Sequence, residues 1–125
     1  MAVSGIGYVN AFVSDLDRAV DFYQGKLGLE LKLADAEHGY ASFQAGPISL
    51  GLAVPGDDQK HLIGTHTGIG LVVDDLVAEH ARLCAEGVTF PMAPSRQPWG
   101  GFMALVEDPD GNVLYLDEVT AAHPQ

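Results

Sequence analysis

The chain has 125 residues, of which 47% are hydrophobic and 18% are charged, a composition that suits one globular domain and excludes a disordered or collagen-like protein. Its apolar runs are far shorter than the ~20 residues of a membrane-spanning helix. Seventeen acidic against six basic residues give a net charge of −11, which disfavours nucleic acid and anionic membranes as partners. The N-terminus lacks the features of a signal peptide and Cys84 is the only cysteine, so we expect a cytoplasmic protein without a disulfide.

An internal repeat is visible when Val13-Ser14-Asp15-Leu16 is aligned with Val73-Asp74-Asp75-Leu76. In each copy an apolar strand runs into an aspartate that can cap a helix. Residues 55–65 are polar and rich in turn-forming residues, as expected of a linker. We therefore predict a single domain over residues 1–125, built from two repeats at about 1–54 and 66–120.

The first repeat begins with an apolar strand at residues 9–13. The helix that follows has one apolar face, formed by Leu16, Val20, Tyr23 and Leu27, and Gly28 ends it. Three strand-like runs come next, at residues 29–33, 40–44 and 48–54. The predicted order of elements in the first repeat is therefore βαβββ.

The second repeat has the same order. A strand at residues 69–73 leads into a helix from Leu76 to about Gly87, followed by strands at 88–90, 102–107 and 113–119. The last two are joined by Asp108-Pro109-Asp110-Gly111-Asn112, whose proline and glycine favour a tight hairpin. We expect Cys84 to have no histidine beside it and therefore not to act as a nucleophile.

The two βαβββ repeats, the run Asp15-Leu16-Asp17-Arg18-Ala19-Val20-Asp21-Phe22-Tyr23 and the run Asp108-Pro109-Asp110-Gly111-Asn112 resemble the vicinal oxygen chelate superfamily, which includes glyoxalases, extradiol dioxygenases and bleomycin-resistance proteins. The resemblance covers nearly the whole chain. It implies an α+β fold of two cupped half-barrels, the glyoxalase/bleomycin-resistance fold, completed in a homodimer.

Enzymes of that superfamily bind a divalent metal through His, Glu or Gln side chains. The resemblance implies that the corresponding positions here are Tyr8, Gly51, Gly68 and Tyr115. Glycine has no side chain to coordinate a metal, and tyrosine is a poor replacement for histidine or glutamate. We therefore predict no metal, no cofactor and no catalytic residue, with a shifted site at His66 and Asp117 as the alternative.

The bleomycin-resistance branch is the part of the superfamily that the chain resembles most, through the run Gln97-Pro98-Trp99-Gly100 ahead of the hairpin. The resemblance implies that Trp99 forms one wall of a drug-binding groove, with His38, Tyr40 or Phe43 on the opposite wall. The ligand-binding residues we predict are Trp99, Tyr8, Tyr115, His38, Tyr40, Phe43, Gly100 and Phe102.

These features predict a metal-independent protein, not an enzyme, that sequesters a cytotoxic aromatic natural product such as a bleomycin-like antibiotic and gives drug resistance. The alternative is a lyase, isomerase or dioxygenase of the same superfamily with a non-standard site, which would use His66 and Asp117, or Tyr8 or Tyr115 as an acid. A regulatory or carrier module is a third possibility.

Overall fold

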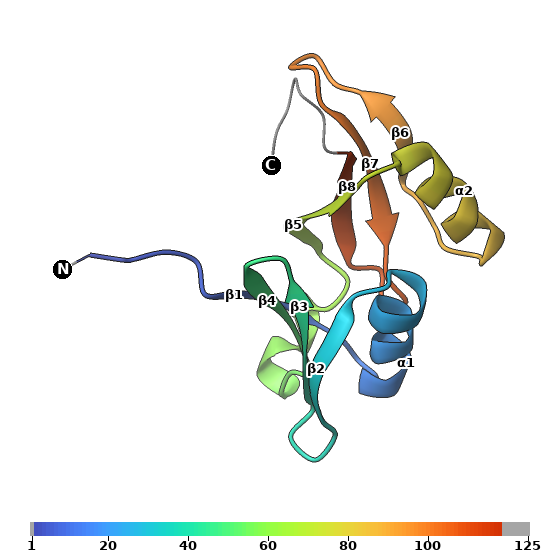
Figure 1. The fold of residues 1–125 in the computed structure, drawn as a ribbon. Coiled ribbons are helices and arrows are strands. Elements are labelled where there is room, and N and C mark those ends of the chain that lie inside the picture. The colour runs from blue at the N-terminus through green and yellow to red at the C-terminus, as the bar shows by residue number, and fades with distance from the viewer. Residues whose placement is uncertain (1, 119–125) are drawn as a thin grey trace. The chain divides into compact units, whose positions relative to one another are not determined.

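The chain forms two compact units, Met1–Gly64 and Thr65–Gln125, in the computed structural model, which describes residues 2–118 (Figure 1). The elements of the first unit, in chain order, are β1 (Tyr8–Phe12), α1 (Leu16–Val20), the π-helical segment η1 (Asp21–Lys26), β2 (Glu30–Asp35), β3 (Tyr40–Ala45) and β4 (Ile48–Ala53), with the 3-10 helix η2 (Asp57–Leu62) after them. The second unit contains β5 (His66–Val73), α2 (Leu76–Ala85), β6 (Met92–Arg96), β7 (Phe102–Glu107) and β8 (Val113–Glu118). Both units are therefore βαβββ modules.

Each unit has one mixed sheet of four strands, in the order β1-β4-β3-β2 or β5-β8-β7-β6. The strand that opens each unit runs parallel to the strand that closes it, and the other pairs are antiparallel. The two sheets therefore have the same topology, as the sequence repeat predicts.

The helices begin where the two aspartates predict. The side chain of Asp15 accepts a hydrogen bond from the Arg18 N–H at 3.1 Å, and that of Asp75 accepts one from the Ala78 N–H at 3.1 Å. The first helix differs from the prediction because it widens into a π-helix after Val20. This turn buries Phe22 and Tyr23 against the sheet.

Each helix covers one face of its own sheet. In the first unit the buried residues include Tyr23, Phe43, Leu50 and Leu52, and the Tyr23 and Phe43 rings lie 6.1 Å apart. In the second unit Leu76 and Leu83 of α2 are buried, together with Ala104, Val106, Leu114 and Leu116 of the sheet. Figure 1 shows α2 beside β6 and β7. Because side chains alternate along a strand, the residues between these core positions face away from the helix.

The hairpin between β7 and β8 is confirmed, and a buried polar pair holds it together. The Asp108 carboxylate accepts hydrogen bonds from the backbone of Asp110 and Asn112 and from the Asn112 side chain, each at 2.9 Å. Asn112 is 1% exposed and also accepts a hydrogen bond from the Thr65 N–H. The carboxylate therefore has partners for its buried charge.

One predicted strand is wrong. A strand was predicted at residues 88–90, but β6 lies at Met92–Arg96. Phe90 instead packs edge-on against His80 of α2, with ring centroids 4.5 Å apart. The predicted ends of the last strand at Val119 and of the second repeat at residue 120 lie outside the described residues. No helix within residues 2–118 is long and apolar enough to span a membrane.

Candidate functional site

The second unit has a hollow of about 340 Å³ on the sheet face that is turned away from α2. Its lining residues are Trp99, Gly101, Met103, Tyr115 and Asp117, and we refer to it as the aromatic hollow. All five come from β7, β8 and the loop between β6 and β7. The side chains that line it are therefore one indole, one thioether, one phenol and one carboxylate.

Strand register explains why these side chains meet. Met103 pairs with Asp117, and Leu105 pairs with Tyr115. Leu114 and Leu116, which alternate with Tyr115 and Asp117, are buried on the helix side. Tyr115 and Asp117 therefore lie on the opposite face, beside Met103.

Trp99 lies at the tip of a tight loop and is 59% exposed. The loop is closed by a hydrogen bond from the Gln97 N–H to the Gly101 carbonyl at 2.7 Å. The Arg96 guanidinium donates to the Gly100 carbonyl at 3.0 Å, and Gly100 has a φ of +97°. Gly100 therefore allows the loop that presents Trp99 to form, because residues with a side chain rarely adopt this backbone conformation.

Two of the predicted ligand-binding residues, Phe43 and Phe102, lie in the core or on the sheet face that the helix covers. Phe43 is fully buried against Tyr23, so it has no surface with which to contact a ligand. Phe102 alternates with the lining residue Met103, and its ring lies beneath the Arg96 guanidinium, 4.8 Å from the centroid. The expectations for Phe43 and Phe102 are therefore corrected, because strand alternation turns both away from the open face.

The open face of the first unit carries Tyr8, Tyr40 and Asn10. Tyr8 is 64% exposed at the start of β1. The Tyr40 ring and the Asn10 carboxamide lie across Gly51: a Cβ atom at Gly51 would be 2.7 Å from the Tyr40 hydroxyl and would also overlap Asn10 Oδ1. Gly51 is therefore glycine because neighbouring side chains occupy the space that its own would need.

The donor set does not fit the metal site implied by the resemblance. The register places Asn10, not Tyr8, beside Gly51, and Gly70, not Gly68, beside Tyr115. The positions that the resemblance implies are thus two tyrosines and two glycines, and the strand partners of Gly51 and Tyr115 are an asparagine and a glycine, so neither set contains a His, Glu or Gln side chain. Within residues 2–118, no three His, Cys, Asp or Glu side chains are grouped closely enough to hold a metal ion.

The alternative metal site at His66 and Asp117 is also contradicted. His66 pairs with Val113, whereas Asp117 pairs with Val72. Val113 and Asp117 are four residues apart on one strand, which corresponds to about 13 Å. The two side chains therefore lie on the same face of the sheet, but they are too far apart to bind one metal ion.

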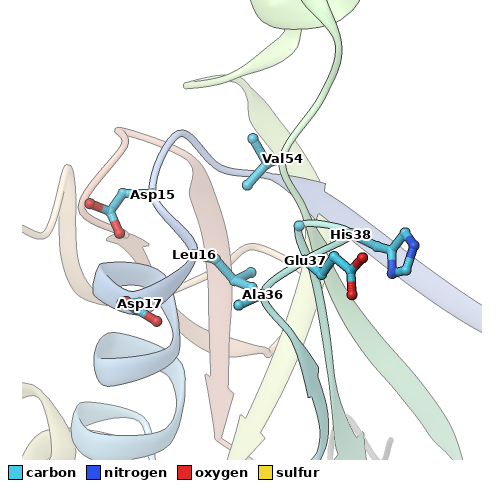
Figure 2. Close-up of a pocket in the computed structure, with 8 residues that line it drawn as sticks. Asp15, Leu16, Asp17, Ala36, Glu37, His38 and Val54 are labelled. Carbon is cyan, nitrogen blue, oxygen red and sulfur yellow. The ribbon is translucent and has the colours of Figure 1, made fainter.

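The first unit has a second hollow, of about 470 Å³, at the beginning of α1 (Figure 2). It is lined by Asp15, Leu16, Asp17, Ala36, Glu37, His38, Gly39 and Val54. His38 is the only predicted ligand-binding residue among them, and its Nδ1 lies 2.9 Å from the carboxylate of Asp35. Hydrogen bonding from His38 lowers the pKa of Asp35 below the ordinary aspartate value. The acidic lining distinguishes this hollow from the aromatic one.

Three features of the structure were not predicted from the sequence. Met103 was not predicted to bind a ligand, although its place opposite Asp117 follows from the hairpin register. Asp117 was considered only as a metal ligand. Cys84 was expected to have no histidine nearby, yet its Sγ lies 3.4 Å from Nε2 of His80, because residues four apart meet on a helix face.

Two βαβββ units with these sheets define a known class of protein. The family model of the glyoxalase/bleomycin resistance protein/dioxygenase superfamily matches residues 5–116, and the chain belongs to this superfamily. The resemblance predicted from the sequence is therefore confirmed.

The relatives include both resistance proteins and enzymes. The chain is 35% identical over 111 residues to a bleomycin resistance protein from Klebsiella pneumoniae, with 82% of each chain covered. It is 32% identical to the structure of TnmS3, an antibiotic-binding protein from Streptomyces sp. CB03234, with a TM-score of 0.79 and coverage of 96% of this chain and 99% of that one. A lactoylglutathione lyase from Agrobacterium tumefaciens, 24% identical with a TM-score of 0.76 over 94% of this chain and 96% of that one, shares the fold.

Proposed function

We propose that the protein binds a planar aromatic natural product in the aromatic hollow and sequesters it, which protects the cell from a cytotoxic, antibiotic-like molecule. The observation that carries this proposal is the position of Trp99, which is 59% exposed and lines a hollow together with Tyr115 and Met103. An exposed indole beside a phenol and a thioether offers a flat ligand both stacking and dispersion contacts. The similarity to a bleomycin resistance protein and to an antibiotic-binding protein supports the same ligand class.

Sequestration requires no covalent step. A base stacked on an aromatic side chain contributes roughly 1–3 kcal/mol, and a ligand ring on Trp99 should contribute a similar amount. When the protein is in excess, the free fraction of the drug is close to the dissociation constant divided by the concentration of free protein. Nanomolar affinity and micromolar protein would therefore lower the free drug about a thousandfold.

We also propose that the protein acts in the cytoplasm as a homodimer. Each outer strand, among them β1 and β5, has only one neighbour in its own sheet. Strands at sheet edges are commonly paired or covered by another chain. Light scattering at several protein concentrations tests this part of the proposal, and a monomer throughout would contradict it.

The function is tested in bacteria that express the wild-type protein or the Trp99→Ala variant at matched levels. The wild-type protein should raise the minimum inhibitory concentration of bleomycin or of another aromatic antibiotic, and Trp99→Ala should lose most of this protection. The drug extracted after incubation with purified protein should have an unchanged mass. A modified drug, or equal sensitivity with and without the protein for the whole panel, would contradict sequestration.

A further inference from the structure

The only cysteine of the chain lies beside a histidine on helix α2. Cys84 is exposed, and its Sγ lies 3.4 Å from Nε2 of His80, about one helical turn earlier in the chain. Residues four apart lie on the same face of a helix, and α2 runs through both of them, from Leu76 to Ala85. The helical backbone therefore brings a thiol and an imidazole together.

A second contact holds the imidazole of His80 in place. Its ring packs edge-on against Phe90, in the segment after α2, with ring centroids 4.5 Å apart and an angle of 82° between the ring planes. His80 is half-buried by its surroundings, whereas Cys84 is exposed. A ligand can therefore reach the thiol from solvent, and the imidazole beside it loses little rotational freedom when the ligand binds.

The distance between the two side chains is close to that of two ligands on one metal ion. In tetrahedral sites zinc–sulfur bonds are about 2.3 Å long and zinc–nitrogen bonds are about 2.0–2.1 Å long. At a tetrahedral angle these bonds place the sulfur about 3.5 Å from the nitrogen. The observed distance of 3.4 Å is therefore near the separation that a chelated ion requires.

We propose that His80 and Cys84 form a two-ligand site for thiophilic divalent metal ions, the class that includes Zn²⁺ and Cd²⁺. The thiol loses its proton to solvent when the ion binds, and the thiolate and the neutral imidazole each supply one electron pair. Within residues 2–118 no third His, Cys, Asp or Glu side chain is grouped with them, so water completes the coordination. The soft thiolate makes the site selective, because Mg²⁺ and Ca²⁺ prefer oxygen ligands.

This site differs from the metal site that the superfamily resemblance implies. The positions implied by the resemblance lie on the strands β1, β4, β5 and β8, whereas His80 and Cys84 lie on a helix. Neither residue lines the aromatic hollow, which is on the sheet face turned away from α2. The inference therefore does not rest on the proposed function, and its failure would leave that function standing.

The acidic surface of the protein is the main competitor for divalent ions. A net charge of −11 raises their local concentration, and carboxylates bind them through oxygen. Stoichiometry alone would not separate such binding from binding at α2. The test therefore needs a signal from the metal–sulfur bond, and Cys84 is the only thiol that can give it.

The full-length, reduced protein is titrated with Cd²⁺ in the presence of excess Mg²⁺, which occupies the carboxylates. The ultraviolet absorption of the cadmium–thiolate bond reports binding to Cys84. We expect this absorption to saturate at one Cd²⁺ per chain and to disappear when Zn²⁺ displaces the probe. Cys84→Ser should abolish the signal.

The contribution of the imidazole is tested with two variants. His80→Ala removes the ring, whereas His80→Phe keeps an aromatic ring against Phe90 but has no nitrogen to bind the metal. Both should lower the affinity for Cd²⁺ at least about tenfold, because the second ligand of a chelate acts at a high effective concentration. The matched control is His61→Ala, which changes an exposed histidine of η2 and should bind Cd²⁺ as the wild-type protein does.

Two results would overturn the inference. One is the absence of the thiolate absorption in the wild-type protein. The other is an unchanged affinity in His80→Phe, which would mean that the thiol binds the metal alone. If neither His80 variant folds, NMR of the wild-type protein decides: one equivalent of Zn²⁺ should shift the ring protons of His80 and leave those of His61 in place, and an unshifted His80 would contradict the site.

Discussion

The imidazole of His66 packs edge-on against the ring of Tyr115, with ring centroids 5.0 Å apart and an angle of 63° between the ring planes. His66 itself does not line the aromatic hollow, whereas Tyr115 does. The backbone N–H of Gly68 donates to His66 Nδ1 at 3.2 Å, which orients the imidazole. His66 is thus a positioning residue that holds one wall of the hollow.

His66→Ala should therefore weaken ligand binding without abolishing it. An aromatic edge-to-face pair contributes about 0.5–1.5 kcal/mol, which corresponds to a severalfold loss of affinity if that energy keeps Tyr115 in place. His61→Ala, which changes an exposed histidine of η2, is the matched control and should bind as the wild-type protein does. Calorimetric titration of the three proteins measures the difference, and equal affinities would contradict the role of His66.

Gly51→Ala should destabilise the first unit. The new Cβ would overlap Asn10 and would lie 2.7 Å from the Tyr40 hydroxyl, so at least one side chain has to move. Overpacking of this kind costs about 1–3 kcal/mol of the free energy of unfolding. Urea denaturation measures it, with Gly25→Ala as the control, because a Cβ there meets nothing within 4 Å. Equal destabilisation by both variants would contradict the crowded arrangement around Gly51.

Asn112→Ala should be among the more destabilising polar substitutions. It removes a side-chain donor from the buried carboxylate of Asp108 and an acceptor from the Thr65 N–H. Leaving buried polar groups without partners costs about 1–3 kcal/mol each, and more for a charged group. The midpoint of urea denaturation should fall clearly, while the exposed-site variant Gln24→Ala should lie within about 0.5 kcal/mol of the wild-type protein. A small effect of Asn112→Ala would contradict the proposed role of this pair.

The interaction between Asp35 and His38 predicts a pH dependence. Hydrogen bonding from the His38 side chain lowers the pKa of the Asp35 carboxyl in the folded protein. The stabilisation is therefore complete above the ordinary aspartate pKa and is lost as the pH falls through the lower, folded-state value. NMR titration of the Asp35 carboxyl carbon should show its pKa rising in His38→Ala, and an unchanged pKa would contradict the pairing.

Most of the fold could be predicted because local signals and the repeat agree. Asp15 and Asp75 cap helices, and Gly111 in the hairpin has a φ of +83°. The strand predicted at residues 88–90 failed because Phe90 contacts a helix residue, His80, which a strand pattern does not reveal. β6 was not predicted because it contains Pro94, and proline is depleted in strands.

The candidate site was harder to predict, because it depends on strand register. The sequence does not distinguish an apolar residue that faces the core from one that faces a ligand. Phe43 faces the core. The positions Tyr8 and Gly68 were taken from the resemblance, and the sequence did not show that the strand partners of Gly51 and Tyr115 are Asn10 and Gly70. By contrast, Trp99 and Tyr115 line the same hollow, as two residues that contact one ligand must.

The most direct test of ligand binding in the aromatic hollow is a fluorescence titration, because Trp99 is the only tryptophan in the chain. The purified protein is titrated with bleomycin and with other aromatic antibiotics, with and without a chelator of divalent metals. Sequestration predicts that at least one antibiotic quenches or shifts the Trp99 emission saturably, to the same extent with and without the chelator. Emission that no antibiotic changes, or that changes only when a divalent metal is present, would contradict it.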